Sequence, residues 1–198
     1  MFVEGGYTLT REEQDADAIL VNTCSVRDQA EQKALGKMGM MGKHREKRGH
    51  VVYGFMGCMA QSRGEELFDR VPHLDLVVGT QKYHRVFGYV DDILRRRQEE
   101  RMDDPSMALE GHTVEEGSSS PAPGEGRLVD TGLEKDSQNT IRDHVVAGKQ
   151  ATAFVSIMQG CNMRCSFCIV PDTHGRERGR PIPDVRSEEH TSELQSPV

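Results

Sequence analysis

Short apolar runs alternate with longer stretches of helical character over the first hundred residues. Three apolar runs predict buried strands: 17–22, 51–56 and 74–78. Three stretches without proline predict helices: 27–48, 62–70 and 81–101. The last of these helices is expected to be amphipathic, with one apolar face made of Val86, Tyr89, Val90, Ile93 and Leu94. Strands that alternate with helices favour an α/β fold with a parallel sheet.

The character of the chain changes after residue 100. Residues 117–126 are rich in Gly, Ser and Pro, which is typical of linkers, and we expect a flexible linker over residues 101–147. An apolar run at 151–158 predicts one more strand, directly before a cluster of cysteines. The predicted domains are therefore residues 1–100 and 148–185, with residues 186–198 as a separate polar tail.

The composition narrows the class of protein. The net charge of −7 argues against a basic surface over the whole chain, although the Arg176–Arg180 tract could contact phosphates locally. No apolar run is long enough to span a bilayer, and the N-terminal residues lack the basic and apolar regions of a signal peptide. We expect a cytoplasmic protein that does not associate with a membrane.

Three of the five cysteines lie within eight residues, as Cys161, Cys165 and Cys168. An odd number of cysteines with this clustering is a poor disulfide framework, and it favours metal ligation. Three thiolates on one loop can hold three irons of a four-iron cluster, which leaves the fourth iron open for a small molecule. The alternative is a zinc site, for which His174 would be the fourth ligand.

Cys24 and Cys58 each follow a predicted strand. The carboxyl ends of parallel strands share one edge of a sheet, which is where ligands bind in α/β folds, so these two thiols could lie close together. The alternative is that each is a small buried apolar residue, as free cysteines often are.

Several tracts together resemble the radical SAM methylthiotransferase family, specifically the members that act on tRNA. The resemblance covers about residues 5–100 and 150–185. The tracts that carry it are Val21–Arg27, Ala30–Lys33, Gly57–Gln61, Leu76–Thr80, Ala153–Asn162, Cys165–Pro171 and Gly175–Pro181. Asp172, His174 and Gly179 depart from the family's usual residues. The family fold would place an α/β methylthiotransferase domain before the first strand and cluster loop of an incomplete radical SAM (β/α) barrel.

The resemblance implies two [4Fe-4S] clusters and S-adenosylmethionine (SAM) as cofactors. Cys161, Cys165 and Cys168 would hold the cluster that cleaves SAM, with Phe167 near that cofactor. Cys24 and Cys58 would hold an auxiliary cluster together with a third cysteine, which the family has before its second strand. The substrate would be N6-isopentenyladenosine beside the anticodon of tRNA, and the reductant an electron donor such as flavodoxin or ferredoxin.

The resemblance also raises expectations about the two ends of the chain. Residues 1–7 are similar to the end of the family's first helix, with Gly5 or Gly6 as its C-cap, so the first strand is expected to lie upstream. Residues 186–198 resemble nothing in the family, and we interpret them as a non-native tail, the alternative being a lineage-specific one. A fragment of this kind is expected to be inactive alone. Two alternatives remain: a methylthiotransferase of a ribosomal-protein aspartate, and a non-catalytic iron–sulfur or zinc module.

Overall fold

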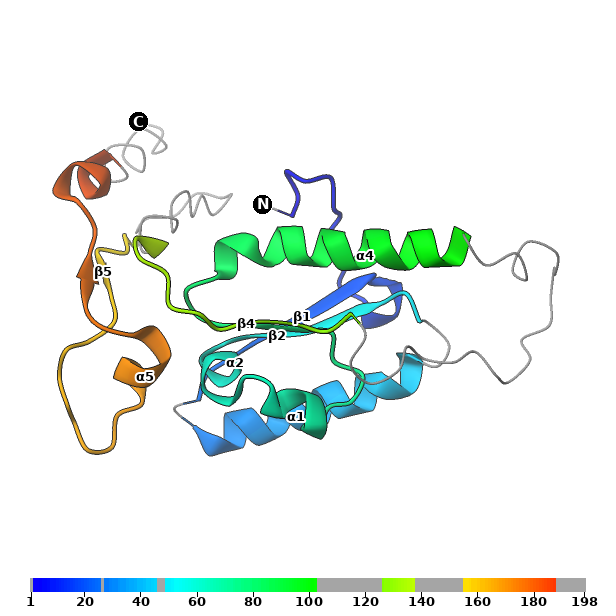
Figure 1. Ribbon diagram of the computed structural model, residues 1–198, viewed down its shortest axis with the longest axis horizontal. Helices are drawn as coiled ribbons and strands as arrows, with labels where there is room; N and C mark the ends of the chain where they lie inside the picture. The colour runs from blue at the N-terminus through cyan, green and yellow to red at the C-terminus, as the bar shows by residue number, and fades with distance from the viewer. Residues whose placement is uncertain (1, 26, 46–48, 103–125, 138–154, 188–198) are drawn as a thin grey trace. The chain divides into compact units, whose positions relative to one another are not determined.

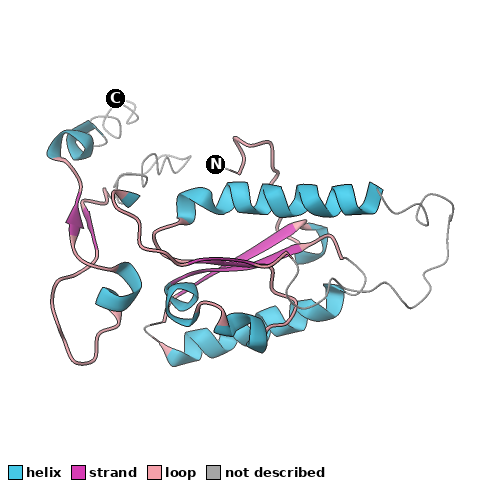
Figure 2. Cartoon of the chain, in the orientation of Figure 1, coloured by secondary structure: helices cyan, strands magenta, loops and turns pink. Residues whose placement is uncertain are grey.

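The computed structural model describes five stretches of the chain: residues 2–25, 27–45, 49–102, 126–137 and 155–187. The chain forms two compact units, residues 1–131 and residues 132–198, which are taken separately below. The elements of both are drawn in Figure 1 and are coloured by type in Figure 2.

The first unit is built on a parallel sheet of four strands in the order β1-β2-β3-β4. The strands are β1 (Ala18–Thr23), β2 (Val52–Gly57), β3 (Leu76–Val78) and β4 (Leu128–Asp130). In the register of the sheet, Thr23 pairs with Gly57 at the carboxyl ends of β1 and β2, and Val78 pairs with Asp130 at those of β3 and β4. The predicted parallel α/β fold is thus confirmed for this unit.

Helices cover both faces of this sheet. On one face lie α1 (Asp28–Arg45), α2 (Cys58–Arg63) and α3 (Glu66–Arg70), and on the other lies α4 (Val86–Met102), as Figure 1 shows. Short 3-10 helices precede β1 (Glu13–Asp15) and α4 (Tyr83–Arg85). The single helix predicted over 62–70 is wrong in its bounds, because α2 begins at Cys58 and ends at Arg63, and α3 follows as a separate helix.

Two apolar clusters form the core, one on each face of the sheet. The α1 side is centred on large buried side chains, among them Met38, Phe55, Met59 and Leu67. On the opposite face, the predicted apolar face of α4 is confirmed. Val86, Val90 and Ile93 are buried, and Tyr89 and Leu94 pack against them.

The expected flexible linker over 101–147 is wrong at its centre. Residues 128–130 form β4, which pairs with β3 and belongs to the first compact unit. A parallel strand forms its hydrogen bonds with a neighbour that is remote in the sequence. A strand of three residues after a polar stretch therefore shows no hydrophobic pattern from which it could be predicted. The parts of the expected linker at 103–125 and 138–147 lie outside the described residues.

The N-terminal residues have the hydrogen bonds with which helices commonly end. The Gly6 amide donates to the Val3 carbonyl and the Tyr7 amide to the Phe2 carbonyl, which is the pattern of a Schellman motif with Gly6 at the C′ position. The rings of Phe2 and Tyr7 pack edge-to-face on each other and on Phe87 of α4. This arrangement fixes the segment before β1 against α4.

The second unit has little regular structure in its described part. It contains β5 (Met158–Gln159), α5 (Val170–His174), β6 (Arg178–Gly179) and a helical turn at 182–187. The strand predicted over 151–158 is reduced to β5 among the residues described, and residues 151–154 lie outside them. β5 pairs with β6 in antiparallel fashion across the segment that contains α5. The expected first strand of a parallel barrel stays a prediction.

A buried ion pair fixes the amino end of β2. The Arg97 guanidinium of α4 lies 2.5 Å from Asp75 Oδ1 and also donates to the Val51 carbonyl at 2.8 Å. Asp75 Oδ2 in turn accepts a hydrogen bond from the Tyr53 amide at 2.9 Å. The Asp75 side chain is only 6% exposed, so its charge depends on these partners.

We predict that Arg97→Ala lowers the free energy of unfolding by about 3–5 kcal/mol, because it removes the cation beside the buried Asp75 carboxylate. Arg95→Ala is the matched control, since Arg95 pairs with Asp91 on the exposed surface of the same helix. The control should cost about 0.5 kcal/mol or less. Urea denaturation of both variants measures the difference, and equal losses would contradict the assignment.

Candidate functional site

Cys24 and Cys58 follow directly on two paired residues of the sheet. Cys24 comes after Thr23 at the end of β1, and Cys58 comes after Gly57 at the end of β2. Since neighbouring strands lie about 4.8 Å apart, the two cysteines emerge side by side at the carboxyl edge. Neither cysteine forms a disulfide, and Cys24 is exposed while Cys58 is half-buried. The predicted placement of both cysteines at one sheet edge is confirmed.

The turn from β2 into α2 requires glycine at position 57. Gly57 has a φ of +97°, which residues with a side chain rarely adopt. A Cβ atom there would strike Asn22 Oδ1 and would lie 2.6 Å from the Thr23 carbonyl oxygen. The absence of a side chain therefore lets β1 and β2 approach closely where the two cysteines begin.

Tyr83 lies at the same edge, in the 3-10 helix before α4. Its hydroxyl donates a long hydrogen bond of 3.5 Å to Asn22 Oδ1. Burial raises the pKa of Tyr83 to about 12, and negative charge on Cys58 contributes to the rise. The phenol therefore stays protonated at neutral pH and presents a hydrogen-bond donor close to Cys58.

Glu31 of α1 connects the segments that carry the two cysteines. Its carboxylate accepts a hydrogen bond from the hydroxyl of Ser25, the residue after Cys24, at 3.1 Å. The other carboxylate oxygen lies 3.0 Å from the guanidinium of Arg63, the last residue of α2. Nothing in the sequence pattern singles out Glu31, because a glutamate in the first turn of a helix usually faces solvent.

Gln61 of α2 holds the carboxyl ends of β3 and β4. Its side-chain amide donates to the Thr131 carbonyl at 2.7 Å and accepts from the Thr80 amide at 3.2 Å. Gly79 leaves room for this contact, since a Cβ at that position would strike the Gln61 amide oxygen. The helix that begins at Cys58 is thereby tied to all four strands of the sheet.

The three clustered cysteines lie on one loop of the second unit, between β5 and α5. The base of the loop is closed by a hydrogen bond from the Cys161 amide to the Gly175 carbonyl at 3.1 Å. A second bond runs from the Glu177 amide to the Asn162 side-chain oxygen at 3.2 Å. Within the loop, the Cys168 amide donates to the Cys165 carbonyl at 3.1 Å.

All three thiols are free, and Cys165 is exposed while Cys161 and Cys168 are half-buried. Phe167 is 92% exposed and so presents its ring to solvent beside them. Among the residues that the structure describes, no three His, Cys, Asp or Glu side chains are placed to hold one metal ion. The assignment of the three cysteines as cluster ligands stays a prediction, as does the place of Phe167 near a cofactor.

The arginines after the loop differ in their availability to a phosphate. Arg178 donates to the carbonyls of Glu134 and His174, and Arg180 donates to the Ser156 carbonyl. Arg180 is buried, and Arg176 is exposed. The predicted phosphate contact of this tract is therefore open to Arg176, while the other two arginines bind the unit's own backbone.

His174 lies at the base of the same loop, next to Gly175. Burial lowers the pKa of His174, and the positive charge of Arg178 lowers it further. Its imidazole is thus neutral down to a lower pH than usual, which is the form that binds a metal.

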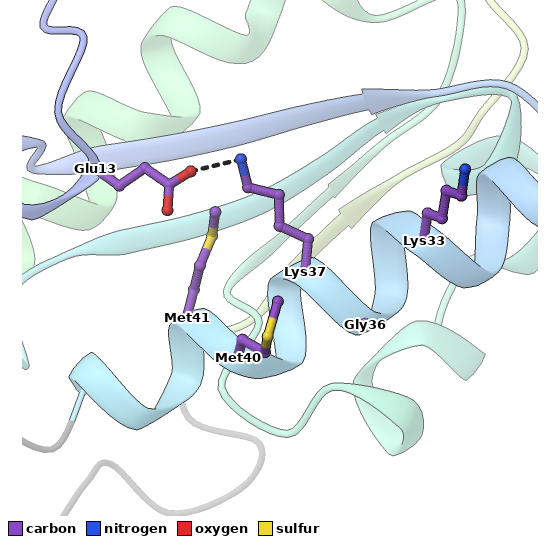
Figure 3. Close-up of a pocket in the computed structure, with 6 residues that line it drawn as sticks. All are labelled: Glu13, Lys33, Gly36, Lys37, Met40 and Met41. Atoms are coloured by element: carbon purple, nitrogen blue, oxygen red, sulfur yellow. Dashed lines mark ion pairs between the residues drawn. The ribbon is translucent and has the colours of Figure 1, made fainter.

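A pocket lies between α1 and the segment that precedes β1, and no cysteine lines it. It has a volume of about 400 Å³, and Glu13 and Lys37 form an ion pair across it, as Figure 3 shows. The residues that line it are Glu13, Lys33, Gly36, Lys37, Met40 and Met41. None of the predicted ligands is among them.

In the part of the chain that the structure describes, no helix is long and apolar enough to cross a membrane.

Comparison with known proteins gives matches over most of the chain. Residues 1–79 match the model of a family described as uncharacterized protein family UPF0004. A tRNA-2-methylthio-N(6)-dimethylallyladenosine synthase of Akkermansia muciniphila is 58% identical over 188 residues, which are 95% of this chain and 38% of the relative. Proteins of the same name from Opitutus terrae and Methylacidiphilum infernorum are 43% and 41% identical, over 91% and 94% of this chain. The chain spans about 38% of the length of the first two relatives and 35% of the third.

The close approach of β1 and β2 at Gly57 can be tested at the sheet edge that carries Cys24 and Cys58. We predict that Gly57→Ala lowers the free energy of unfolding by about 1–3 kcal/mol, because alanine is strained at a positive φ and its Cβ would strike Asn22. Gly36→Ala is the matched control, since Gly36 is exposed in α1 with open space around its Cα. The control should raise stability by about 0.5–1 kcal/mol. Urea denaturation measures the free energy of unfolding of both variants. A change of the same sign in the two would contradict the role assigned to Gly57.

Proposed function

Since the chain belongs to the methylthiotransferase family, we propose that it carries cysteines of two iron–sulfur sites used in methylthiolating tRNA. The relatives it matches are named as tRNA-2-methylthio-N(6)-dimethylallyladenosine synthases, and the family generally depends on iron–sulfur clusters and SAM. The observation that carries the proposal is the division of the five cysteines, none of them in a disulfide, into two sets. Three lie on one loop, and two lie at one edge of a sheet.

The loop set fits a four-iron cluster by the chemistry of its donors. Cys161, Cys165 and Cys168 are unpaired thiols with access to solvent, and the bonds at the loop base hold the segment that carries them. These three would ligate a [4Fe-4S] cluster and leave one iron for SAM. When bound, that cluster supplies the electron that cleaves SAM. Phe167 would cover the cofactor, since its ring is exposed beside the three cysteines.

The edge set supports an auxiliary cluster through its geometry. Cys24 and Cys58 emerge from adjacent strands, and Tyr83 offers its protonated hydroxyl beside them. Two thiolates at adjacent strand ends would hold two corners of a cluster. The Tyr83 hydroxyl would exchange its long bond to Asn22 for one to a cluster sulfur. Hydrogen bonds of this kind stabilise the reduced form of iron–sulfur centres.

The substrate proposed is tRNA with an N6-isopentenylated adenosine beside the anticodon, reached with electrons from a flavodoxin or ferredoxin. The relatives' names favour tRNA over a protein aspartate as the acceptor. Arg176 would contact a phosphate, because it is the arginine of its tract that stays exposed. The domains proposed are a methylthiotransferase domain that includes β4 and a radical SAM segment that begins in the second unit.

We predict that Ala substitution of Cys161, Cys165 or Cys168 abolishes the loop cluster. Each change removes one of three ligands, and a four-iron cluster held by two thiolates is not retained. The measurement is the visible absorption and iron content of the chain after anaerobic reconstitution with iron and sulfide. Cys24→Ala is the control and should keep the loop cluster, because this cysteine belongs to the first compact unit.

His174→Ala distinguishes the cluster from a zinc site at the same loop. A zinc ion would need His174 as its fourth ligand, whereas a four-iron cluster with an open iron needs only the three cysteines. We therefore expect the variant to reconstitute with unchanged iron content. A non-catalytic zinc module would give a different result. The unaltered chain would bind zinc tightly and show no visible chromophore, and the His174→Ala variant would lose the zinc.

A further inference from the structure

Glu31 is a buried carboxylate that the proposed chemistry does not use. It is 4% exposed, on a helix whose neighbouring residues Gln32 and Lys33 are exposed. Burial of a charged group is costly unless the group is paired and hydrogen-bonded. Glu31 meets both conditions, because its two oxygens receive the Ser25 hydroxyl and the Arg63 guanidinium.

The two partners of Glu31 belong to the two segments that carry the edge cysteines. Ser25 adjoins Cys24 in the loop that leaves β1, and Arg63 closes the six-residue helix that begins at Cys58. The loop after β1 has no strand to hold it beyond Thr23, since pairing with β2 ends there. The hydroxyl of Ser25 connects this loop to α1 through its hydrogen bond to Glu31.

We propose that Glu31 is a positioning residue, which ties the loop of Cys24 to the helix of Cys58 and so sets the distance between the two thiols. The inference rests on the proposed auxiliary site, for which it supplies the geometry. The carboxylate touches neither thiol in this role. It acts through Ser25 on one side and through Arg63 on the other.

The proximity of the two thiols is measured in the metal-free chain with dibromobimane, which becomes fluorescent when it joins two neighbouring thiols. Cys161, Cys165 and Cys168 are first replaced by serine, so that Cys24 and Cys58 alone can react. We expect Glu31→Ala to slow the cross-linking about tenfold, the effect of losing hydrogen bonds to a charged group. Glu31→Gln should retain most of the rate, because its amide oxygen still accepts from Ser25 or Arg63.

Glu66→Ala is the matched control, since Glu66 also pairs with Arg63, at 3.7 Å, but is exposed. It should leave the rate unchanged. Arg63→Met is a second variant, which removes the bond between Glu31 and the helix of Cys58. It should slow cross-linking as Glu31→Ala does. Circular dichroism at the temperature of the assay identifies the variants that stay folded.

A folded Glu31→Ala variant that cross-links at the unaltered rate would overturn the inference. So would an equal loss in Glu66→Ala, which would trace the effect to surface charge. Because the assay contains no iron, its outcome is independent of the proposed function. The two proposals can also be told apart. If cross-linking depends on Glu31 but the chain never assembles an iron–sulfur cluster, the proposed function is contradicted and the positioning role of Glu31 is retained.

Discussion

The parallel pairing of β1 with β2 is the constraint on which the candidate site depends. Parallel strands send their carboxyl ends to the same edge, and the register places Thr23 opposite Gly57. This pairing brings Cys24 and Cys58, which are 34 positions apart in the sequence, to neighbouring strand ends. Gly57 makes the approach possible, because any side chain there would meet Asn22 and the Thr23 carbonyl.

Buried polar contacts hold the two ends of this sheet in different ways. At the amino end, Arg97 and Asp75 fix the start of β2 from α4. At the carboxyl edge, Glu31 and Gln61 bind the connections that leave the strands. Apolar packing on the two faces stabilises the layers but is not directional, so the hydrogen-bonded side chains decide where the thiols lie.

The sequence was sufficient for the parts of the fold that local pattern controls. The first three strands, α1 and the apolar face of α4 follow from periodicity, and the shared edge of Cys24 and Cys58 follows from strand order. β4 was missed because Leu128–Asp130 is short and its pairing partner, β3, lies about 50 positions earlier. The β5–β6 pair could not be predicted, because strands of two residues show no periodicity. Glu31 and Gln61 could not be recognised, because their importance depends on what three-dimensional packing brings to them.

The most direct test of the account is the pattern of cross-strand nuclear Overhauser effects in the isotopically labelled chain. The parallel register predicts contacts between Thr23 and Gly57 and between Val78 and Asp130. The first places the cysteines side by side, and the second brings β4 into the sheet. Contacts that pair Thr23 with Val52 would mean an antiparallel arrangement. Cys24 would then lie opposite Val51, and its separation from Cys58 along the strand would be about 23 Å. That result would contradict the shared cysteine edge and everything inferred from it.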